Sequence, residues 1–166
     1  MTLDPYSSHI PLLVGAVAAT RGKVVELGAG FYSTPVLQAL CTAQGRELTT
    51  IETDREWLNK FAFEKPCTGL LIDNWEELHR FGSLLECDVA FIDVAPAEAR
   101  AELIHTMKRW ARVIVVHDVE VEQQHNYPGV EDALRSYKYR IEDRRRGPWT
   151  AAVSNEDIRQ WSSLIR

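Results

Sequence analysis

Residues 23–35, with the sequence KVVELGAGFYSTP, decide the fold of this chain. The apolar and β-branched residues of 23–27 predict a buried strand. Gly28 and Gly30 then allow a sharp turn and a close approach of the backbone, because neither carries a Cβ atom. At 33–35, a hydroxyl cap from Ser33 and a proline in the first turn predict the start of a helix. The stretch is therefore a strand, a glycine turn and a helix, the repeating unit of an α/β sheet.

The rest of the chain repeats this alternation. The first helix is predicted to end at Gly45, and Asp54 is predicted to cap a second helix that contains Trp57, Leu58 and Phe61. Two further helices are expected near 75–80 and over 96–110. The other strands are expected at 48–51, 69–72, 89–92, 113–116, 137–143 and 149–154. Apolar runs suit parallel strands covered on both faces, and Gly147-Pro148 marks a turn between the last two strands. We therefore expect a doubly wound, mostly parallel seven-stranded sheet with an antiparallel C-terminal hairpin.

Composition limits the class of protein. The 166 residues suggest a single domain over 1–166, and 45% hydrophobic with 26% charged residues is an ordinary globular balance. The formal net charge of −5 makes nucleic acid an unexpected partner, and Arg144-Arg145-Arg146 is interpreted as solvated surface. Cys41, Cys67 and Cys87 follow no metal-ligand spacing and are interpreted as reduced core residues. No 18-residue apolar run or signal peptide is present, so a cytoplasmic protein without a membrane span is expected.

The residues directly after the strands carry most of the polar chemistry. In doubly wound sheets the ligand crevice lies beyond the carboxyl ends of the strands, where the strand order reverses. Glu52 follows the second strand and has the position from which an acid can accept hydrogen bonds from both hydroxyls of a ribose. Asp73 and Asn74 follow the third strand and could meet an adenine amino group. Trp75 could stack on the adenine ring, although half-buried packing is an equal alternative.

The glycine turn by itself does not choose between nucleotide ligands. Ser33 occupies the place of the third glycine in the dinucleotide fingerprint, which disfavours a nicotinamide or flavin cofactor. An oxidoreductase is therefore the weaker alternative.

Four segments together resemble the class I S-adenosylmethionine-dependent methyltransferases. They are residues 24–30, 50–54, 71–75 and 91–93. The resemblance covers roughly residues 20 to 155 and implies S-adenosylmethionine as cofactor. It implies that the glycine loop, with Glu26, Gly28, Ala29, Gly30 and Ser33, lies along the methionine portion. It also implies that Glu52 holds the ribose, that Asp73, Asn74 and Trp75 lie near adenine, and that Asp93 lines the cofactor site.

Further segments resemble a small bacterial and phage subgroup with this fold. They are residues 8–11, 32–35, 93–96 with Arg100, 116–118, and 148–150 with 154–155. This likeness supports the fold and cofactor and implies no substrate. We expect His9 and Arg100 to contact the acceptor, with a surface or capping role as the alternative for His9.

The predicted catalytic residues are Asp93, His117 and Asp118, which follow the two central strands. Methyl transfer needs positioning, plus a base if the acceptor must lose a proton. Histidine exchanges a proton near neutral pH, so His117 is the expected base, with a purely structural role as the alternative.

A metal-free site is expected. Catechol-type methyltransferases hold a divalent cation with acids at the places of Asp93 and Asp118, but an amide follows the second acid in that family. Val119 stands there in this chain, and this departure disfavours the metal.

The expected partner is a small-molecule acceptor. No Asn-Pro-Pro-aromatic sequence follows the fourth strand, which favours oxygen as the acceptor atom. A non-catalytic module that binds S-adenosylmethionine or a partner protein remains the alternative, and a homo-oligomer is compatible with the missing substrate domain.

Overall fold

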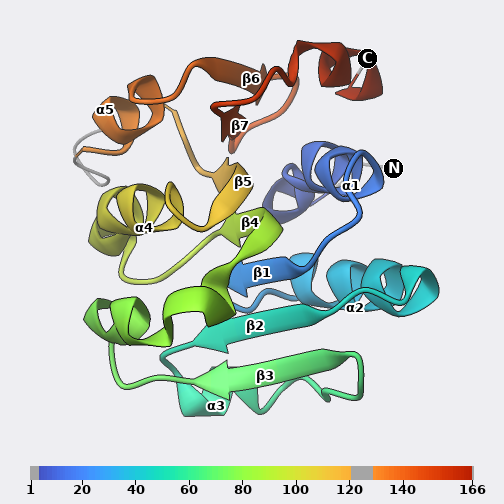
Figure 1. Cartoon of the computed structure of the whole chain (residues 1–166), viewed down its shortest axis with the longest axis vertical. Helices are drawn as coiled ribbons and strands as arrows, with labels where there is room; N and C mark the ends of the chain where they lie inside the picture. The colour runs from blue at the N-terminus through green and yellow to red at the C-terminus, as the bar shows by residue number, and fades with distance from the viewer. Residues whose placement is uncertain (1–3, 121–128, 166) are drawn as a thin grey trace.

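The computed structural model describes residues 4–120 and 129–165. They form three layers, in which one central sheet lies between two layers of helices (Figure 1). The seven strands lie in the order β3-β2-β1-β4-β5-β7-β6. Their bounds are β1 Val24–Leu27, β2 Leu48–Glu52, β3 Cys67–Leu71, β4 Cys87–Ile92, β5 Ala111–His117, β6 Tyr139–Asp143 and β7 Thr150–Ser154. The first five strands pair in parallel, and β7 runs antiparallel to both β5 and β6. The expected doubly wound sheet with an antiparallel hairpin is confirmed.

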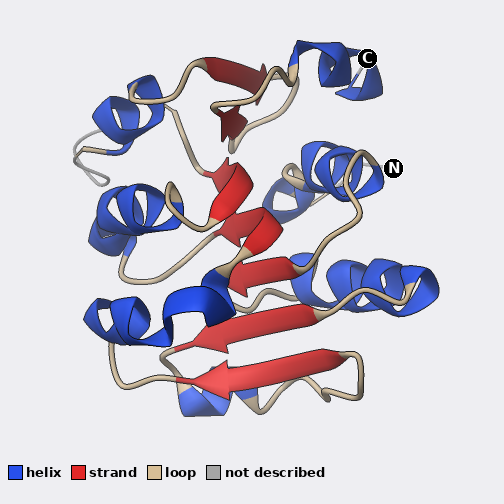
Figure 2. Cartoon of the chain, viewed as in Figure 1, coloured by secondary structure: helices blue, strands red, loops and turns tan. Residues whose placement is uncertain are grey.

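Helices cover both faces of the sheet (Figure 2). The α-helices are α1 Ile10–Ala18, α2 Ser33–Gln44, α3 Arg55–Leu58, α4 Arg100–Met107 and α5 Val130–Arg135. The 3₁₀ segments are η1 Pro5–Ser7, η2 Trp75–Leu85, η3 Ala97–Ala99 and η5 Arg159–Ile165. One hydrophobic core lies between the sheet and α1, α2 and η5, and a second core lies between the sheet and η2, α4 and α5.

The apolar runs of the central strands supply both cores. Val113 and Val115 of β5 belong to the core beside α1, whereas Ile114 and Val116 belong to the core beside α4. Successive side chains of a strand point to opposite faces, so a strand buried on both faces needs apolar residues without alternation. This explains why these strands were recognisable from the sequence.

Several local predictions are confirmed, and others are corrected. Gly45 ends α2 with φ 65°, and Asp54 caps α3 by accepting a hydrogen bond from the Trp57 amide. The expected hydroxyl cap from Ser33 is wrong: α2 begins after Tyr32 without a side-chain cap, and the Thr34 hydroxyl accepts from the Gly30 amide instead. Phe61 lies outside α3, which is four residues long.

The sequence prediction also differs from the structure at helix ends. The helix expected over 96–110 is a 3₁₀ turn followed by α4, which ends at Met107. The residues of α1 and α5 were not predicted to form helices. The α1 sequence IPLLVGAVA is apolar almost throughout, so it lacks the helical periodicity on which such a prediction rests.

Cys41, Cys67 and Cys87 are buried and free, as predicted. The arginine run lies at the surface, where Arg144 pairs with Glu142 and Arg145 with Asp143. Within the described part of the chain, no helix combines the length and apolarity that a membrane span requires.

The strand order reverses between β1 and β4, and their carboxyl ends touch. The Asp93 amide donates to the Leu27 carbonyl oxygen over 3.0 Å. Gly28 has φ +89°, and a Cβ atom built on it would lie 2.0 Å from the Asp93 carbonyl oxygen. Only glycine fits this backbone conformation and this contact. The glycine turn after β1 is therefore placed directly beside the residues that follow β4.

Candidate functional site

A cleft of about 1120 Å³ lies at the carboxyl ends of the central strands. It extends from the glycine turn after β1, past the end of β2, to the residues that follow β4 and β5. Its lining includes the predicted site residues His9, Ala29, Gly30, Ser33, Glu52, Asp93, Arg100, His117 and Asp118. The structure therefore brings together most of the residues selected from the sequence.

Glu26, on β1, supports the glycine turn through hydrogen bonds to neighbouring hydroxyl groups. Its side chain is fully buried, and its Oε2 accepts hydrogen bonds from the Thr34 hydroxyl over 3.0 Å and the Thr50 hydroxyl over 2.7 Å. Thr34 in turn accepts from the Gly30 amide. Burial raises the pKa of Glu26 to about 7, although hydrogen bonds from Ser33, Thr50 and Thr34 oppose the shift. Through these hydrogen bonds Glu26 connects the glycine turn to Thr34 of α2 and Thr50 of β2.

Glu52 lies beside the glycine turn and is 7% exposed. Its Oε1 accepts from the amides of Thr53 and Asp54, and its Oε2 accepts from the Ala29 amide over 3.0 Å. A carboxylate has roughly four lone-pair positions, so Oε2 retains capacity for a further donor. The residue is both a structural acceptor and a group that faces the cleft.

Asp73, Asn74 and Trp75 line a neighbouring cleft of about 440 Å³ instead of the main one. Thr53 and Pro96 belong to the lining of both clefts, so the two adjoin. The Trp75 indole is 7% exposed, packs in the core beside α4 and donates to the Ala95 carbonyl oxygen over 3.0 Å. The packing interpretation of Trp75 therefore accounts for its contacts better than stacking on a ligand.

Arg100 lies between two carboxylates at the other end of the main cleft. Its guanidinium contacts Asp93 Oδ1 at 2.8 Å and Asp118 Oδ2 at 3.0 Å. It also donates to the carbonyl oxygens of Val94 and His117, and the residue is 5% exposed. Arg100 thus occupies the position between Asp93 and Asp118 in which catechol-type methyltransferases hold a divalent cation. Asp118 has φ 57°, a left-handed conformation that is costly for a residue with a side chain and typical of functional sites.

His117, at the end of β5, has a partner at each ring nitrogen. Nδ1 lies 3.0 Å from Asp93 Oδ2 and 3.6 Å from Asp118 Oδ1, and Nε2 lies 3.0 Å from the Ser8 hydroxyl oxygen. Burial would raise the pKa of Asp93, but the hydrogen bond and charge of His117, with the charge of Arg100, hold that pKa below its usual value. His117 therefore faces the cleft as part of a connected polar group.

His9 lies just before α1 and packs against this group. Its ring is 3% exposed, with ring centroids 4.9 Å from Phe91 and 4.6 Å from His117. Burial, helped by His117, lowers the pKa of His9 to about 4, so the ring is neutral near pH 7. Although His9 precedes α1, its side chain makes no cap hydrogen bond. The surface and capping interpretations of His9 are therefore wrong, and the residue lines the cleft.

Sequence reasoning missed several residues of the site. Ser8, Thr34 and Thr50 supply hydroxyl partners for His117 and Glu26, yet single hydroxyls in a sequence carry no distinguishing pattern. Tyr6 and Phe31 line the cleft and are 72% and 59% exposed. Exposed aromatic side chains beside a glycine turn could have been noticed, because large apolar groups at the surface often mark binding sites.

Known proteins resemble this chain in structure. No protein-family model matches it, and no curated protein matches its sequence. The O-methyltransferase TomG from Streptomyces achromogenes, solved with S-adenosylmethionine, is similar over 93% of this chain and 82% of its own, with a TM-score of 0.65 and 17% identity. An O-methyltransferase from Bacillus cereus, solved with S-adenosylhomocysteine, is similar over 92% and 82%, with a TM-score of 0.66 and 14% identity.

A human protein extends the comparison. Human methyltransferase-like protein 13, solved with S-adenosylhomocysteine, is similar over 95% of this chain and 87% of its own, with a TM-score of 0.65 and 12% identity. At these identities the likeness shows the fold. The chain therefore has the Rossmann-like fold of these methyltransferases.

The raised pKa of Glu26 predicts a pH-dependent stability. Between about pH 4.5 and 7 the unfolded chain releases this proton and the folded chain retains it, so wild-type stability falls as the pH rises through this window. Glu26→Gln keeps a neutral side chain, so its free energy of unfolding should rise relative to wild type over the same window. Urea unfolding at several pH values measures this, with Glu64→Gln at the surface as the control for removing a carboxylate. A stability difference independent of pH would contradict a buried, protonated Glu26.

Proposed function

We propose that this chain, which has the fold of class I S-adenosylmethionine-dependent methyltransferases, binds S-adenosylmethionine and transfers its methyl group to an oxygen atom of a small-molecule acceptor. The observation that carries the proposal is one continuous cleft. The glycine turn and Glu52 line one end of it, and His9, Asp93 and His117 line the other. The solved structures with this fold that contain S-adenosylmethionine or S-adenosylhomocysteine support the choice of cofactor.

The cofactor would lie along the glycine turn. Residues 28–30, supported by Glu26 and Ser33, would pass along the methionine portion, where the two glycines, which lack a Cβ atom, permit close approach. Glu52 Oε2 would accept from the ribose hydroxyls in addition to the Ala29 amide. Asp73 and Asn74, in the adjoining cleft, would reach the adenine edge past Thr53 and Pro96. These roles support S-adenosylmethionine over a dinucleotide, because Ser33 stands where the dinucleotide-binding fingerprint has its third glycine.

The acceptor would lie at the imidazole end of the cleft. In the reaction an acceptor oxygen attacks the methyl carbon, the carbon–sulfur bond breaks, and the acceptor proton is released. We propose that the group of His9, Asp93 and His117, with Asp118 and Arg100 behind it, positions this oxygen and promotes the loss of its proton. Contact between His117 Nε2 and an acceptor requires displacement of Ser8, which now lies 3.0 Å from that nitrogen. Arg100 would then act by holding Asp93 and Asp118 in place, because its donors already meet protein oxygens.

The cofactor identity is tested by thermal stability. A ligand that binds only the folded state stabilises it by about 2.7 kcal/mol at a concentration 100 times its Kd. S-adenosylmethionine and S-adenosylhomocysteine should each raise the melting temperature, and NAD at the same concentration should not. A rise with NAD alone would replace this proposal with a nucleotide-dependent oxidoreductase.

Glu52→Gln tests the ribose contact. The substitution places an amide where carboxylate oxygens accept hydrogen bonds, so S-adenosylhomocysteine should bind more weakly by about 1.5 to 3 kcal/mol, the range for hydrogen bonds to charged groups. Calorimetric titration measures this, and Glu56→Gln, exposed on α3, is the matched control. Because Glu52 also accepts backbone amides, the folded fraction of the variant must be checked by circular dichroism. Unchanged affinity in a folded variant would place the ribose elsewhere, with Asp54 next to test.

His117→Ala tests the acceptor end of the cleft. With an acceptor found by screening phenols, alcohols and carboxylic acids, turnover should fall by roughly 10²- to 10⁴-fold, the range for losing proton-transfer catalysis. S-adenosylhomocysteine affinity should stay close to wild type, since the ring faces the acceptor end. The same substitution at His105, exposed on α4, is the control. Wild-type turnover in His117→Ala would show that the residue is structural, and cofactor binding without any turnover would favour a non-catalytic binding module.

A further inference from the structure

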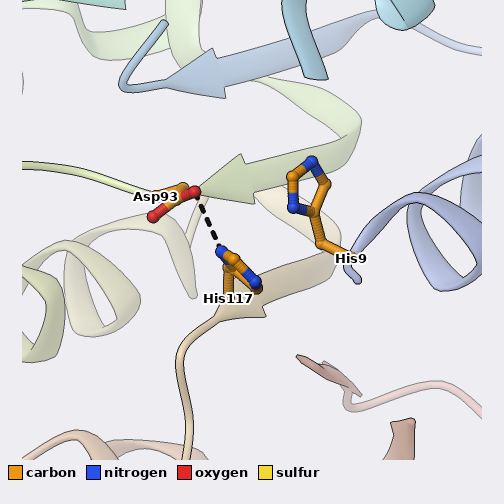
Figure 3. A group of neighbouring side chains, drawn as sticks. All are labelled: His9, Asp93 and His117. Carbon is orange, nitrogen blue, oxygen red and sulfur yellow. Dashed lines mark hydrogen bonds and ion pairs between the residues drawn. The ribbon is translucent and has the colours of Figure 1, made fainter. Parts of the chain in front are cut away.

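Three side chains from distant parts of the chain converge at the inner end of the cleft. His9 precedes α1, Asp93 follows β4 and His117 ends β5 (Figure 3). One potential ligand atom from each, an imidazole nitrogen or a carboxylate oxygen, lies within 4.8 Å of the other two. Both imidazoles are almost completely buried, with 3% of His9 and 2% of His117 exposed. The pair of imidazoles and the carboxylate form a compact set of nitrogen and oxygen donors.

His9 has no hydrogen-bond partner among the described residues. Both of its ring nitrogens are buried and unpaired, although the ring is fixed between Phe91 and His117. A buried polar atom that has lost water without gaining a partner is destabilising, and an unfilled ion site is one of the explanations for such an atom. The unpaired nitrogens therefore point to a ligand that belongs in this place.

The hydrogen bonds around His117 are compatible with a bound cation. The Ser8 hydroxyl lies 2.5 Å from the Pro148 carbonyl oxygen, which can only accept, so the single proton of Ser8 is directed there. The 3.0 Å contact between Ser8 and His117 Nε2 then requires that Nε2 donate. In the neutral ring Nδ1 therefore carries a lone pair, and it lies 3.0 Å from Asp93 Oδ2. Two acceptors this close need a positive charge between them, either a proton or a metal ion.

The charges and supporting contacts suit a cation. Among the described residues, the carboxylates of Asp93 and Asp118 share one guanidinium, that of Arg100, so with neutral imidazoles the two acids exceed their cationic partner by one charge. Arg100 contacts Asp93 through Oδ1, and Oδ2 faces His117. Metal-bound histidines usually donate their second ring N–H to a protein oxygen, and the Ser8 hydroxyl oxygen, 3.0 Å from His117 Nε2, is in place to accept it.

We propose that His9, Asp93 and His117 bind a divalent transition-metal ion of borderline softness, such as Zn²⁺ or Co²⁺. Two imidazoles and one carboxylate suit these ions better than Mg²⁺ or Ca²⁺, which prefer oxygen ligands. Bonds of about 2.0 to 2.1 Å in a tetrahedral arrangement place ligand atoms roughly 3.4 Å apart. Because His117 Nδ1 and Asp93 Oδ2 already lie 3.0 Å apart, it is His9 that must move inward. No hydrogen bond of its ring opposes that movement. The ligand set differs from the Asp93–Asp118 oxygen pair, because the guanidinium of Arg100 lies between those two acids.

The test measures ion binding without donor or acceptor, so it does not depend on methyl transfer. The full chain, freed of metal with a chelator, is titrated with Co²⁺, whose visible absorption reports four-coordinate nitrogen and oxygen ligands. One Co²⁺ per chain should bind, Zn²⁺ should displace it, and Mg²⁺ should not. His9→Gln should weaken Co²⁺ binding by more than the roughly 10- to 100-fold that loss of a supporting contact causes.

Controls separate the site from surface histidines and from misfolding. His105→Gln, exposed on α4, should bind Co²⁺ like wild type. His9→Gln removes no hydrogen bond of the described structure, so it should fold, and its affinity for S-adenosylhomocysteine should stay near that of wild type. Asp93→Asn provides a second ligand variant. Failure of wild type to bind Co²⁺, equal affinity in His9→Gln, or displacement by Mg²⁺ would each overturn the proposal. Failure to bind S-adenosylhomocysteine would overturn the cofactor assignment and leave the ion site standing.

Discussion

The contact between the carboxyl ends of β1 and β4 is the constraint on which the rest of the site depends. A side chain at Gly28 would place its Cβ atom 2.0 Å from the Asp93 carbonyl oxygen, so the two strands can end together only if residue 28 is glycine. The strand order reverses at this contact, and the helices that follow β1 and β4 lie on opposite faces of the sheet. The crevice between them therefore begins at Gly28 and Asp93. The same contact brings the glycine turn and the acidic end of the cleft into one continuous space.

Charge compensation fixes the other end of the cleft. Arg100, at the first position of α4, is 5% exposed and joins Asp93 to Asp118. A buried guanidinium is stable only when its donors meet acceptors, and two carboxylates with two backbone carbonyl oxygens provide them. These contacts also hold Asp118 in its left-handed conformation, which would otherwise relax. The start of α4, the end of β4 and the end of β5 are thus fixed relative to one another by one side chain.

The N-terminal segment completes the site from outside the strand and helix repeat. Ser8 contacts His117 and the Pro148 carbonyl oxygen, and the His9 ring fills the space beside Phe91. The segment is held there by α1, whose Leu12, Leu13 and Ala16 are buried in the core beside α2. Packing of an apolar helix therefore positions two polar side chains at the centre of the cleft. The exposed rings of Tyr6 and Phe31 also line the cleft and make part of its surface apolar.

The sequence by itself determined the sheet, the glycine turn and the group of residues that follow the strands. Short runs of β-branched residues such as Val113–Val116 predict a strand without reference to distant residues, and Gly28 and Glu52 have fixed places relative to their strands. Only the tertiary structure decided which partner each polar group takes. It left α2 without a side-chain cap and placed the Thr34 hydroxyl against the Gly30 amide, packed Trp75 in the core, placed Arg100 between Asp93 and Asp118, and buried His9. The physical reason is range: strand and turn propensities act within a few residues, whereas His9 and His117 are 108 positions apart and meet only because the sheet and α1 pack together.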